Sequence, residues 1–133
     1  MSEITILDNE FITMKYYPDK KILHHTFHKY IFGDEFRAAL NKGVEVLQQY
    51  NAHKWLSDDR ENSALPKEDT NWSVTDWFPR VVKAGWKYWA IVLPKKIVGQ
   101  MNMNQFIEEY SKKGVITKIF SDPTDAMTWL EKQ

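Results

Sequence analysis

The stretch from Lys87 to Leu93, Lys-Tyr-Trp-Ala-Ile-Val-Leu, constrains the fold more than any other part of the sequence. It is almost continuously apolar, and Pro94 follows it directly. A strand with one solvated face alternates apolar and polar residues, whereas a strand covered on both faces is apolar throughout. The run therefore predicts a central strand in a sheet that carries helices on its faces.

The beginning of the chain predicts antiparallel strands. Apolar and polar residues alternate over Phe11–Tyr17, which is the period-two pattern of a half-buried strand. Pro18-Asp19-Lys20 supplies a turn, and a second strand follows over Lys21–His28. A short strand over Glu3–Leu7 is compatible with the same hairpin and would extend it.

Helices and strands alternate along the rest of the chain. Phe36, Leu40, Val44 and Leu47 are spaced by three and four residues, which predicts a helix from about Asp34 to Tyr50. The further elements are a strand at His53–Ser57, a polar loop at Asp58–Asn71, a helix that begins between Trp72 and Asp76 and ends at Gly85, the central strand, a helix at Val98–Lys112, a strand at Val115–Phe120 and a helix opened by Pro123. This order predicts one α/β domain over residues 1–133. Its mixed sheet has four to six strands, the later ones parallel, with about four helices packed on it.

Several residues mark the expected helix ends. Asp34 is the expected N-cap of the first helix, and Ser121 or Asp122 that of the last. Gly85 occupies the position after a helix that glycine favours. Pro79 restricts the helix that ends at Gly85, because proline is tolerated only in the first turn of a helix or at a kink.

Composition restricts the partners. Eighteen basic residues balance eighteen acidic ones, and no basic block offers a nucleic-acid surface. Cysteine is absent, which removes disulfides, thiolate nucleophiles and cysteine-ligated metals. The N-terminus has no secretory-signal pattern, and no run approaches the roughly 18 apolar residues of a membrane span. These features predict a cytoplasmic protein.

Aromatic residues make up 14% of the chain and include six tryptophans. Large flat side chains in the middle of the sequence favour a core built of big residues, and they are also typical of ligand pockets and partner surfaces.

The order of elements and several local motifs resemble the STAS-like, SpoIIAA-type fold, in particular its small bacterial single-domain members. The resemblance covers most of the chain. It is carried by Trp55-Leu56-Ser57-Asp58-Asp59-Arg60, Trp72, Trp77-Phe78-Pro79-Arg80, Ala84-Gly85, Ala90-Ile91-Val92-Leu93-Pro94, Phe120-Ser121-Asp122, Ala126 and Trp129-Leu130.

The resemblance implies a regulatory protein in which phosphorylation of a serine at a helix start controls binding to a kinase or other partner. That serine lies in an Asp-Ser-Ser/Thr-Gly motif. Here the comparable strand end reads Ser57-Asp58-Asp59-Arg60, without glycine and with two carboxylates that would repel a phosphate. The analogy therefore extends to the fold more than to the mechanism.

The strand end also holds the candidate site. Open α/β sheets bind ligands outside the carboxyl ends of parallel strands, and polar residues follow the strand at His53–Ser57. A protein partner or a small ligand would bind there. A carboxylate or phosphate group of that ligand would be bound by the planar guanidinium of Arg60. The candidate binding residues are Ser57, Asp58, Asp59, Arg60, Trp72 and Trp77. Alternatively, one aspartate caps a turn and Arg60 forms an ordinary ion pair.

The sequence contains no recognisable catalytic motif. There is neither a glycine-rich phosphate loop nor a Gly-x-Ser-x-Gly elbow. His24 and His28 share a strand face about 13 Å apart at roughly 3.3 Å per residue, while His25 points the other way, so these three predict no metal site. We expect no cofactor and no catalytic residue.

Three roles remain open. The leading hypothesis is a non-enzymatic regulatory or binding domain. The alternatives are a small hydrolase or transferase that uses Asp58 and Asp59, and a structural homo-oligomer. Exposure of Met101 and Met103 beside Val98 would favour a homodimer surface or a lid, although core packing of this helix is expected.

Overall fold

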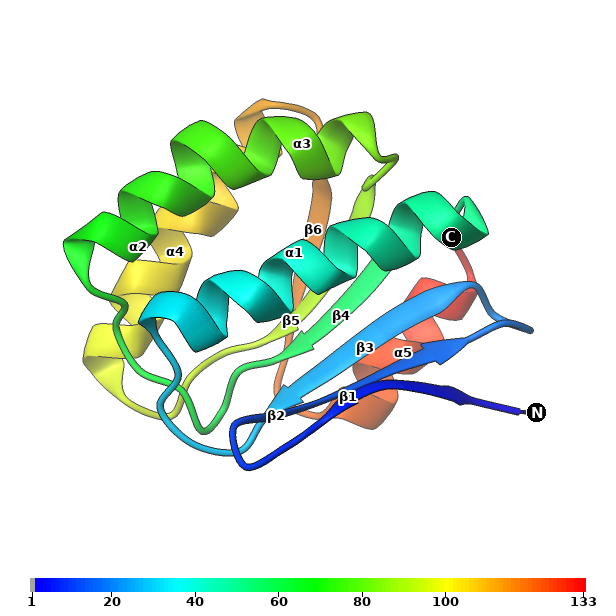
Figure 1. The fold of residues 1–133 in the computed structure, drawn as a ribbon, viewed down its shortest axis with the longest axis horizontal. Coiled ribbons are helices and arrows are strands. Elements are labelled where there is room, and N and C mark those ends of the chain that lie inside the picture. Colours follow the sequence, from blue (N-terminus) through cyan, green and yellow to red (C-terminus); the bar gives the residue numbers. More distant parts are fainter. Residues whose placement is uncertain (1) are drawn as a thin grey trace.

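The computed structural model describes residues 2–133 and contains one six-stranded sheet whose strands are adjacent in sequence order (Figure 1). The strands are β1 (Ile4–Asp8), β2 (Ile12–Tyr17), β3 (Ile22–Phe27), β4 (Lys54–Asp58), β5 (Tyr88–Val92) and β6 (Ile116–Phe120). The first three strands pair antiparallel, and β3 to β6 pair parallel. The expected mixed α/β fold with an antiparallel N-terminal hairpin is confirmed.

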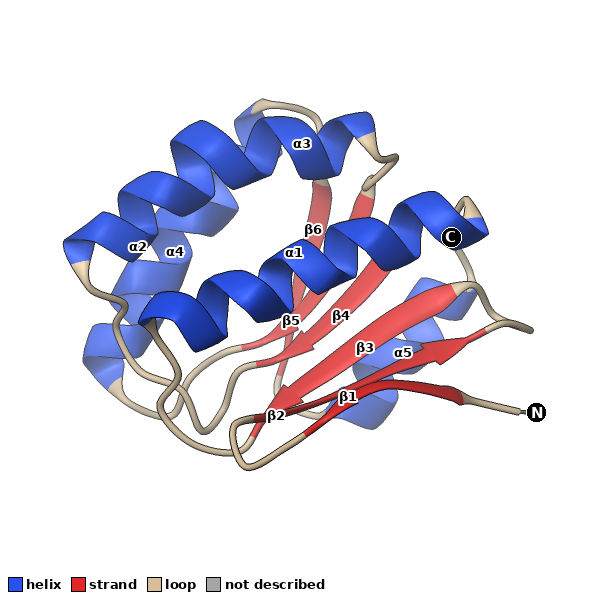
Figure 2. Cartoon of the chain, in the orientation of Figure 1, coloured by secondary structure: helices blue, strands red, loops and turns tan. Residues whose placement is uncertain are grey.

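Helices cover both faces of this sheet (Figure 2). They are α1 (Gly33–Tyr50), α2 (Lys67–Trp72), the π-helical turn η1 (Ser73–Trp77), α3 (Phe78–Lys83), α4 (Ile97–Lys112) and α5 (Pro123–Glu131). From β3 to β6, each parallel strand lies next to the one before it in sequence, always on the same side. Because such crossover connections share one handedness, α1, α2–α3 and α4 all lie on the same face of the sheet. The last helix, α5, packs on the other face.

The predicted central strand is β5, which lies between β4 and β6. Trp89 and Ile91 join the large core under α1, α3 and α4, whereas Ala90 joins the smaller cluster under α5. All three are buried. The continuous apolar pattern therefore reflects burial on both faces, as the sequence predicts.

The predicted N-cap of α1 is wrong. The helix begins at Gly33, after the extended residue Phe32, so Asp34 lies inside its first turn. The backbone N–H of Gly33 instead donates to Asp69 Oδ2 at 2.7 Å, and Arg37 Nε donates to Asp69 Oδ1 at 2.9 Å. The cap comes from α2, thirty-six residues further along the chain, which no local pattern could indicate. The cap predicted for the last helix is confirmed, because Asp122 accepts from the Thr124 N–H.

The predicted polar loop over Asp58–Asn71 is wrong in its second half, where α2 begins at Lys67. The segment lacks an apolar stripe, so its periodicity gives no helical signal. It is held instead by a buried polar residue, Asp69, which is 2% exposed.

The turn η1 explains how the chain accommodates Pro79. A proline ring clashes with the carbonyl four residues earlier, here that of Thr75, and removes a hydrogen-bond donor. The helix widens at that point, and the Phe78 N–H donates to the Ser73 carbonyl five residues back. The π turn therefore separates α2 from α3 without interrupting the path of the helix. It also places Ser73 and Trp77 in the core.

Candidate functional site

An interior cavity of about 50 Å³ lies between the sheet and the helices of the large core. Its fifteen lining residues are all buried, the most exposed being Leu65 and Met103 at 8%. Most of the wall is aromatic, and its largest rings are Trp55, Trp77, Trp86 and Trp89. A cavity needs roughly 10–15 Å³ to hold one water, so this one accommodates several waters or a ligand of a few non-hydrogen atoms.

Three polar side chains reach this cavity from the strands. His25 lies on β3, Ser57 on β4, and Asp59 directly follows β4. His25 and Ser57 are partners in the parallel register. Because side chains alternate along a strand, Trp55, Ser57 and Asp59 all face the same side. The polar end of the cavity, formed by Ser57 and Asp59, therefore lies near the carboxyl end of β4, where open α/β sheets bind ligands, and the cavity extends from there to Trp86, which precedes β5.

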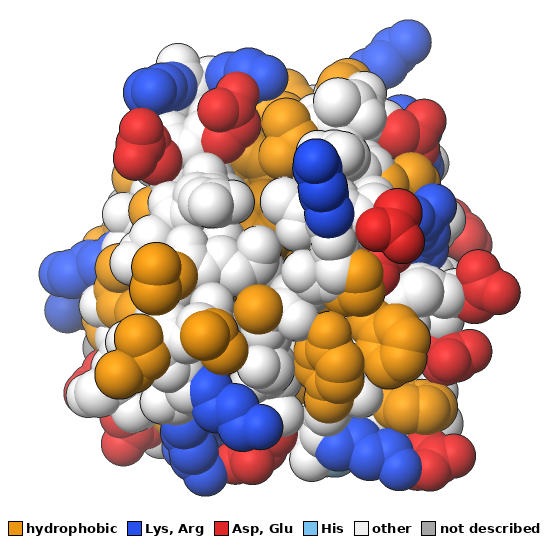
Figure 3. All heavy atoms as spheres, turned by 90° about the vertical axis from the view of Figure 1, so that its left-hand side faces the viewer, with side chains coloured by type: hydrophobic (Ala, Val, Ile, Leu, Met, Phe, Trp, Pro, Cys, Tyr) orange, Lys and Arg blue, Asp and Glu red, His pale blue; other side chains and the backbone are white. Residues whose placement is uncertain are grey.

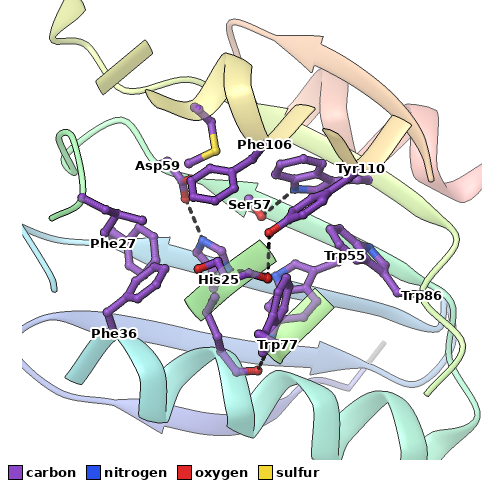
Figure 4. Close-up of a pocket in the computed structure, with 15 residues that line it drawn as sticks. His25, Phe27, Phe36, Trp55, Ser57, Asp59, Trp77, Trp86, Phe106 and Tyr110 are labelled. Carbon is purple, nitrogen blue, oxygen red and sulfur yellow. Dashed lines mark hydrogen bonds and ion pairs between the residues drawn. The ribbon is translucent and has the colours of Figure 1, made fainter. Parts of the chain in front are cut away.

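Both ring nitrogens of His25 have partners (Figure 4). Trp55 Nε1 lies 2.9 Å from Nδ1, and Asp59 Oδ1 lies 2.7 Å from Nε2. An indole nitrogen can only donate, so Nδ1 accepts and the imidazole proton resides on Nε2. The Nε2–H therefore donates to the Asp59 carboxylate, and His25 is held as the neutral imidazole.

The second oxygen of Asp59 is available to a ligand. Within residues 2–133 no protein group donates to Oδ2, and because no buried side-chain oxygen or nitrogen there lacks a partner, Oδ2 borders space that water can enter, although Asp59 is only 2% exposed. Nearby, the Ser57 hydroxyl accepts from Trp89 Nε1 at 2.9 Å and retains its own O–H for donation. The cavity thus offers one carboxylate oxygen and one hydroxyl within an otherwise largely aromatic wall.

Tyr110 contributes a further fixed polar group. Its hydroxyl donates to the Ser73 carbonyl at 3.3 Å, and burial raises the pKa of the phenol. Its ring stacks on Phe78 with 4.1 Å between the centroids. Tyr110 therefore remains a neutral donor that anchors α4 to the π turn.

The opposite face of the sheet holds a separate polar group. Arg60 donates to both oxygens of Asp58, from Nε at 2.9 Å and from Nη2 at 2.8 Å. Burial lowers the pKa of His24 to about 4. Asp58 is 3% exposed and its charge is balanced by Arg60.

The structure divides the predicted site residues among three places. Ser57, Asp59 and Trp77 line the cavity. Asp58 and Arg60 pair on the other face. Trp72 lies outside the cavity, with the guanidinium carbons of Arg37 and Arg80 at 5.2 and 5.9 Å from its ring.

Sequence reasoning missed His25 as part of the site. It placed His25 on the strand face opposite His24, which is confirmed, because His25 joins the large core and His24 does not. Its partners Trp55 and Asp59 are thirty or more residues away. The only available signal was a histidine on an apolar strand face.

No group of histidine, aspartate or glutamate side chains within residues 2–133 is arranged to hold a metal ion. None of the described helices is both long and apolar enough to cross a membrane.

Exposed apolar side chains gather on the side of the molecule formed by α2, the start of α4 and the adjoining loops, near the carboxyl ends of the parallel strands (Figure 3). Ile97, Val98 and Met101 on α4 are 72%, 57% and 63% exposed, and Tyr30 stacks on the exposed Phe32. Met103, in contrast, is buried in the core. Only Met101 of the two methionines therefore lies beside Val98 at the surface, and the homodimer remains a prediction.

The structure is an α/β domain with a largely aromatic cavity between the sheet and the helices of one face, and the polar residues Ser57 and Asp59 of this cavity lie near the carboxyl end of β4. No protein-family model, curated protein or solved structure matches the chain.

Proposed function

We propose that the chain is a non-enzymatic binding domain whose ligand is a small molecule held in the interior cavity. The observation that carries the proposal is the Asp59 carboxylate, which lines a largely aromatic cavity and whose only side-chain partner within residues 2–133 is His25. Burying a charged group costs free energy unless hydrogen bonds or an opposite charge compensate it. Ligand sites commonly combine such an apolar wall with a few convergent polar groups.

The geometry supports binding more than catalysis. Ser57, His25 and Asp59 are the residue types of a hydrolytic triad, but a triad needs one histidine nitrogen on the serine. Here Trp55 and Asp59 occupy both nitrogens. The paired-carboxylate hydrolase also lacks support, since Asp58 pairs with Arg60 on the face opposite Asp59.

The kinship with STAS-like domains stays part of the proposal. Under it, ligand binding at the strand ends would regulate a partner, in place of serine phosphorylation. The exposed side chains of Ile97, Val98 and Met101 lie at the start of α4, which follows β5. A partner that binds this surface would distinguish the ligand-bound domain from the ligand-free one.

The six indole N–H signals in a proton–nitrogen NMR spectrum test the proposal. We expect titration with tert-butanol, a neutral probe of five non-hydrogen atoms, to shift the signals of Trp55, Trp77, Trp86 and Trp89, which line the cavity. Trp72 and Trp129 lie outside it and serve as internal controls.

Matched variants extend this test. Leu40→Phe adds volume to the cavity wall and should weaken the titration at least several-fold, whereas Leu7→Phe adds the same volume outside the cavity and should leave it unchanged. Equal shifts in all six tryptophans, or none, would contradict an interior binding site.

A further inference from the structure

We infer that the ligand of this cavity is a small organic cation, such as an alkylammonium ion; the inference rests on the proposed function. The juxtaposition that points to it is an Asp59 carboxylate without a cationic partner on the wall of a largely aromatic cavity.

Asp59 contributes the negative charge. Its only ion-pair or hydrogen-bond partner among the side chains of residues 2–133 is His25. Because Trp55 donates to His25 Nδ1, that ring is held neutral and does not balance the carboxylate. No lysine or arginine in the described chain pairs with Asp59, whereas the adjacent Asp58 has Arg60. The Asp59 carboxylate therefore has no cationic partner among the side chains of residues 2–133.

Folding has already removed this carboxylate from bulk water, since Asp59 is 2% exposed. A neutral ligand would leave its charge unbalanced, and an anion would add repulsion. A cation forms a buried ion pair with Oδ2, and each ion then compensates the desolvation of the other. Among ligands of one shape, the cation is favoured.

The wall suits an organic cation more than a metal ion. Eight of the fifteen lining residues are phenylalanine, tyrosine or tryptophan, and metal ions need several oxygen or nitrogen ligands that this wall lacks. At the strand end that carries Asp59, the rings include Phe27, whose centroid lies 4.3 Å from that of His25, the hydrogen-bond partner of Asp59. The negative faces of such rings attract alkylammonium groups. The small volume restricts the ligand to a few non-hydrogen atoms.

The test compares two probes of the same shape, tert-butylammonium chloride and tert-butanol, by the indole titration at neutral pH and constant ionic strength. We expect tert-butylammonium to bind at least about tenfold more tightly to the natural protein. Asp59→Asn keeps an oxygen acceptor for His25 Nε2 and should abolish this preference while tert-butanol still binds. Asp58→Asn, which changes the neighbouring carboxylate on the opposite face, should leave the preference intact.

Equal or weaker binding of the ammonium ion, or a preference that survives Asp59→Asn, would overturn the cation and leave the cavity as a site for neutral ligands. Failure of both probes to move the lining tryptophans would overturn the binding site as well. The comparison in the natural protein decides the charge preference even when Asp59→Asn does not fold. Sodium chloride at the same concentration separates a general salt effect from binding.

Discussion

His25 is the residue on which the site depends, because it joins a tryptophan and a carboxylate through one ring. Its neutral state follows from the donor character of the indole. Sequence analysis predicted the direction of His25 on its strand, since alternation is local. It could not predict Trp55 and Asp59 as partners, because the parallel register between β3 and β4 is established only after α1 has crossed between them.

His24, the next residue, provides a test at the residue scale. Burial lowers its pKa from 6.5 to about 4, so the unfolded chain binds a proton over this range that the native state does not. Linkage then requires the free energy of unfolding to fall as the pH decreases from about 6.5 to about 4. The contribution is about 1.4 kcal/mol per pH unit, or about 3 kcal/mol in total.

Urea denaturation of the natural protein and of His24→Gln, at several pH values between 7.5 and 4, measures this contribution. Glutamine does not titrate, so the natural protein should lose stability relative to the variant as the pH falls. Parallel stability curves for the two proteins would show that His24 does not have a depressed pKa.

The elements show which sequence signals are sufficient. Strand and helix positions follow the predictions closely wherever an apolar period exists, as in β2, β5 and α1. The helix α2 escaped prediction because its anchor is a buried aspartate that caps another helix. The stability of α2 is therefore a tertiary property that its own sequence does not display.

Close packing of α1 on β4 provides a test at the element scale. A Cβ added to Gly43 would lie 2.1 Å from Trp55 Cη2, and Trp55 is fixed by its hydrogen bond to His25. Alanine gains about 1 kcal/mol of helix propensity, but overpacking a core typically costs 1–3 kcal/mol and this overlap is severe. We expect Gly43→Ala to lower the free energy of unfolding by about 2 kcal/mol.

Chemical denaturation measures this difference, with Gln49→Ala on the exposed side of α1 as the control that should change stability little. A Gly43→Ala protein as stable as the natural one would mean that α1 and β4 are not in close contact. Its Trp55 indole signal should also shift, because the ring must move.

At the scale of the whole molecule, the sequence predicted the mixed sheet, its antiparallel start, its parallel strands and the edge at which polar residues gather. The cavity could not be predicted from the sequence. An interior void is the difference between the space among the elements and the summed volume of side chains from β3, β4, β5 and three helical segments. No local pattern encodes that difference. The split of Asp58 and Asp59 between the two faces follows from strand alternation only when the end of β4 is known.

A crystal structure of the protein grown with saturating tert-butanol would show whether the cavity binds a small molecule. We predict one alcohol molecule enclosed by Trp77, Phe106 and Tyr110, with its hydroxyl within hydrogen-bond distance of Asp59 Oδ2 or Ser57 Oγ. A core in which side chains fill this space, or which holds only ordered waters there, would contradict it.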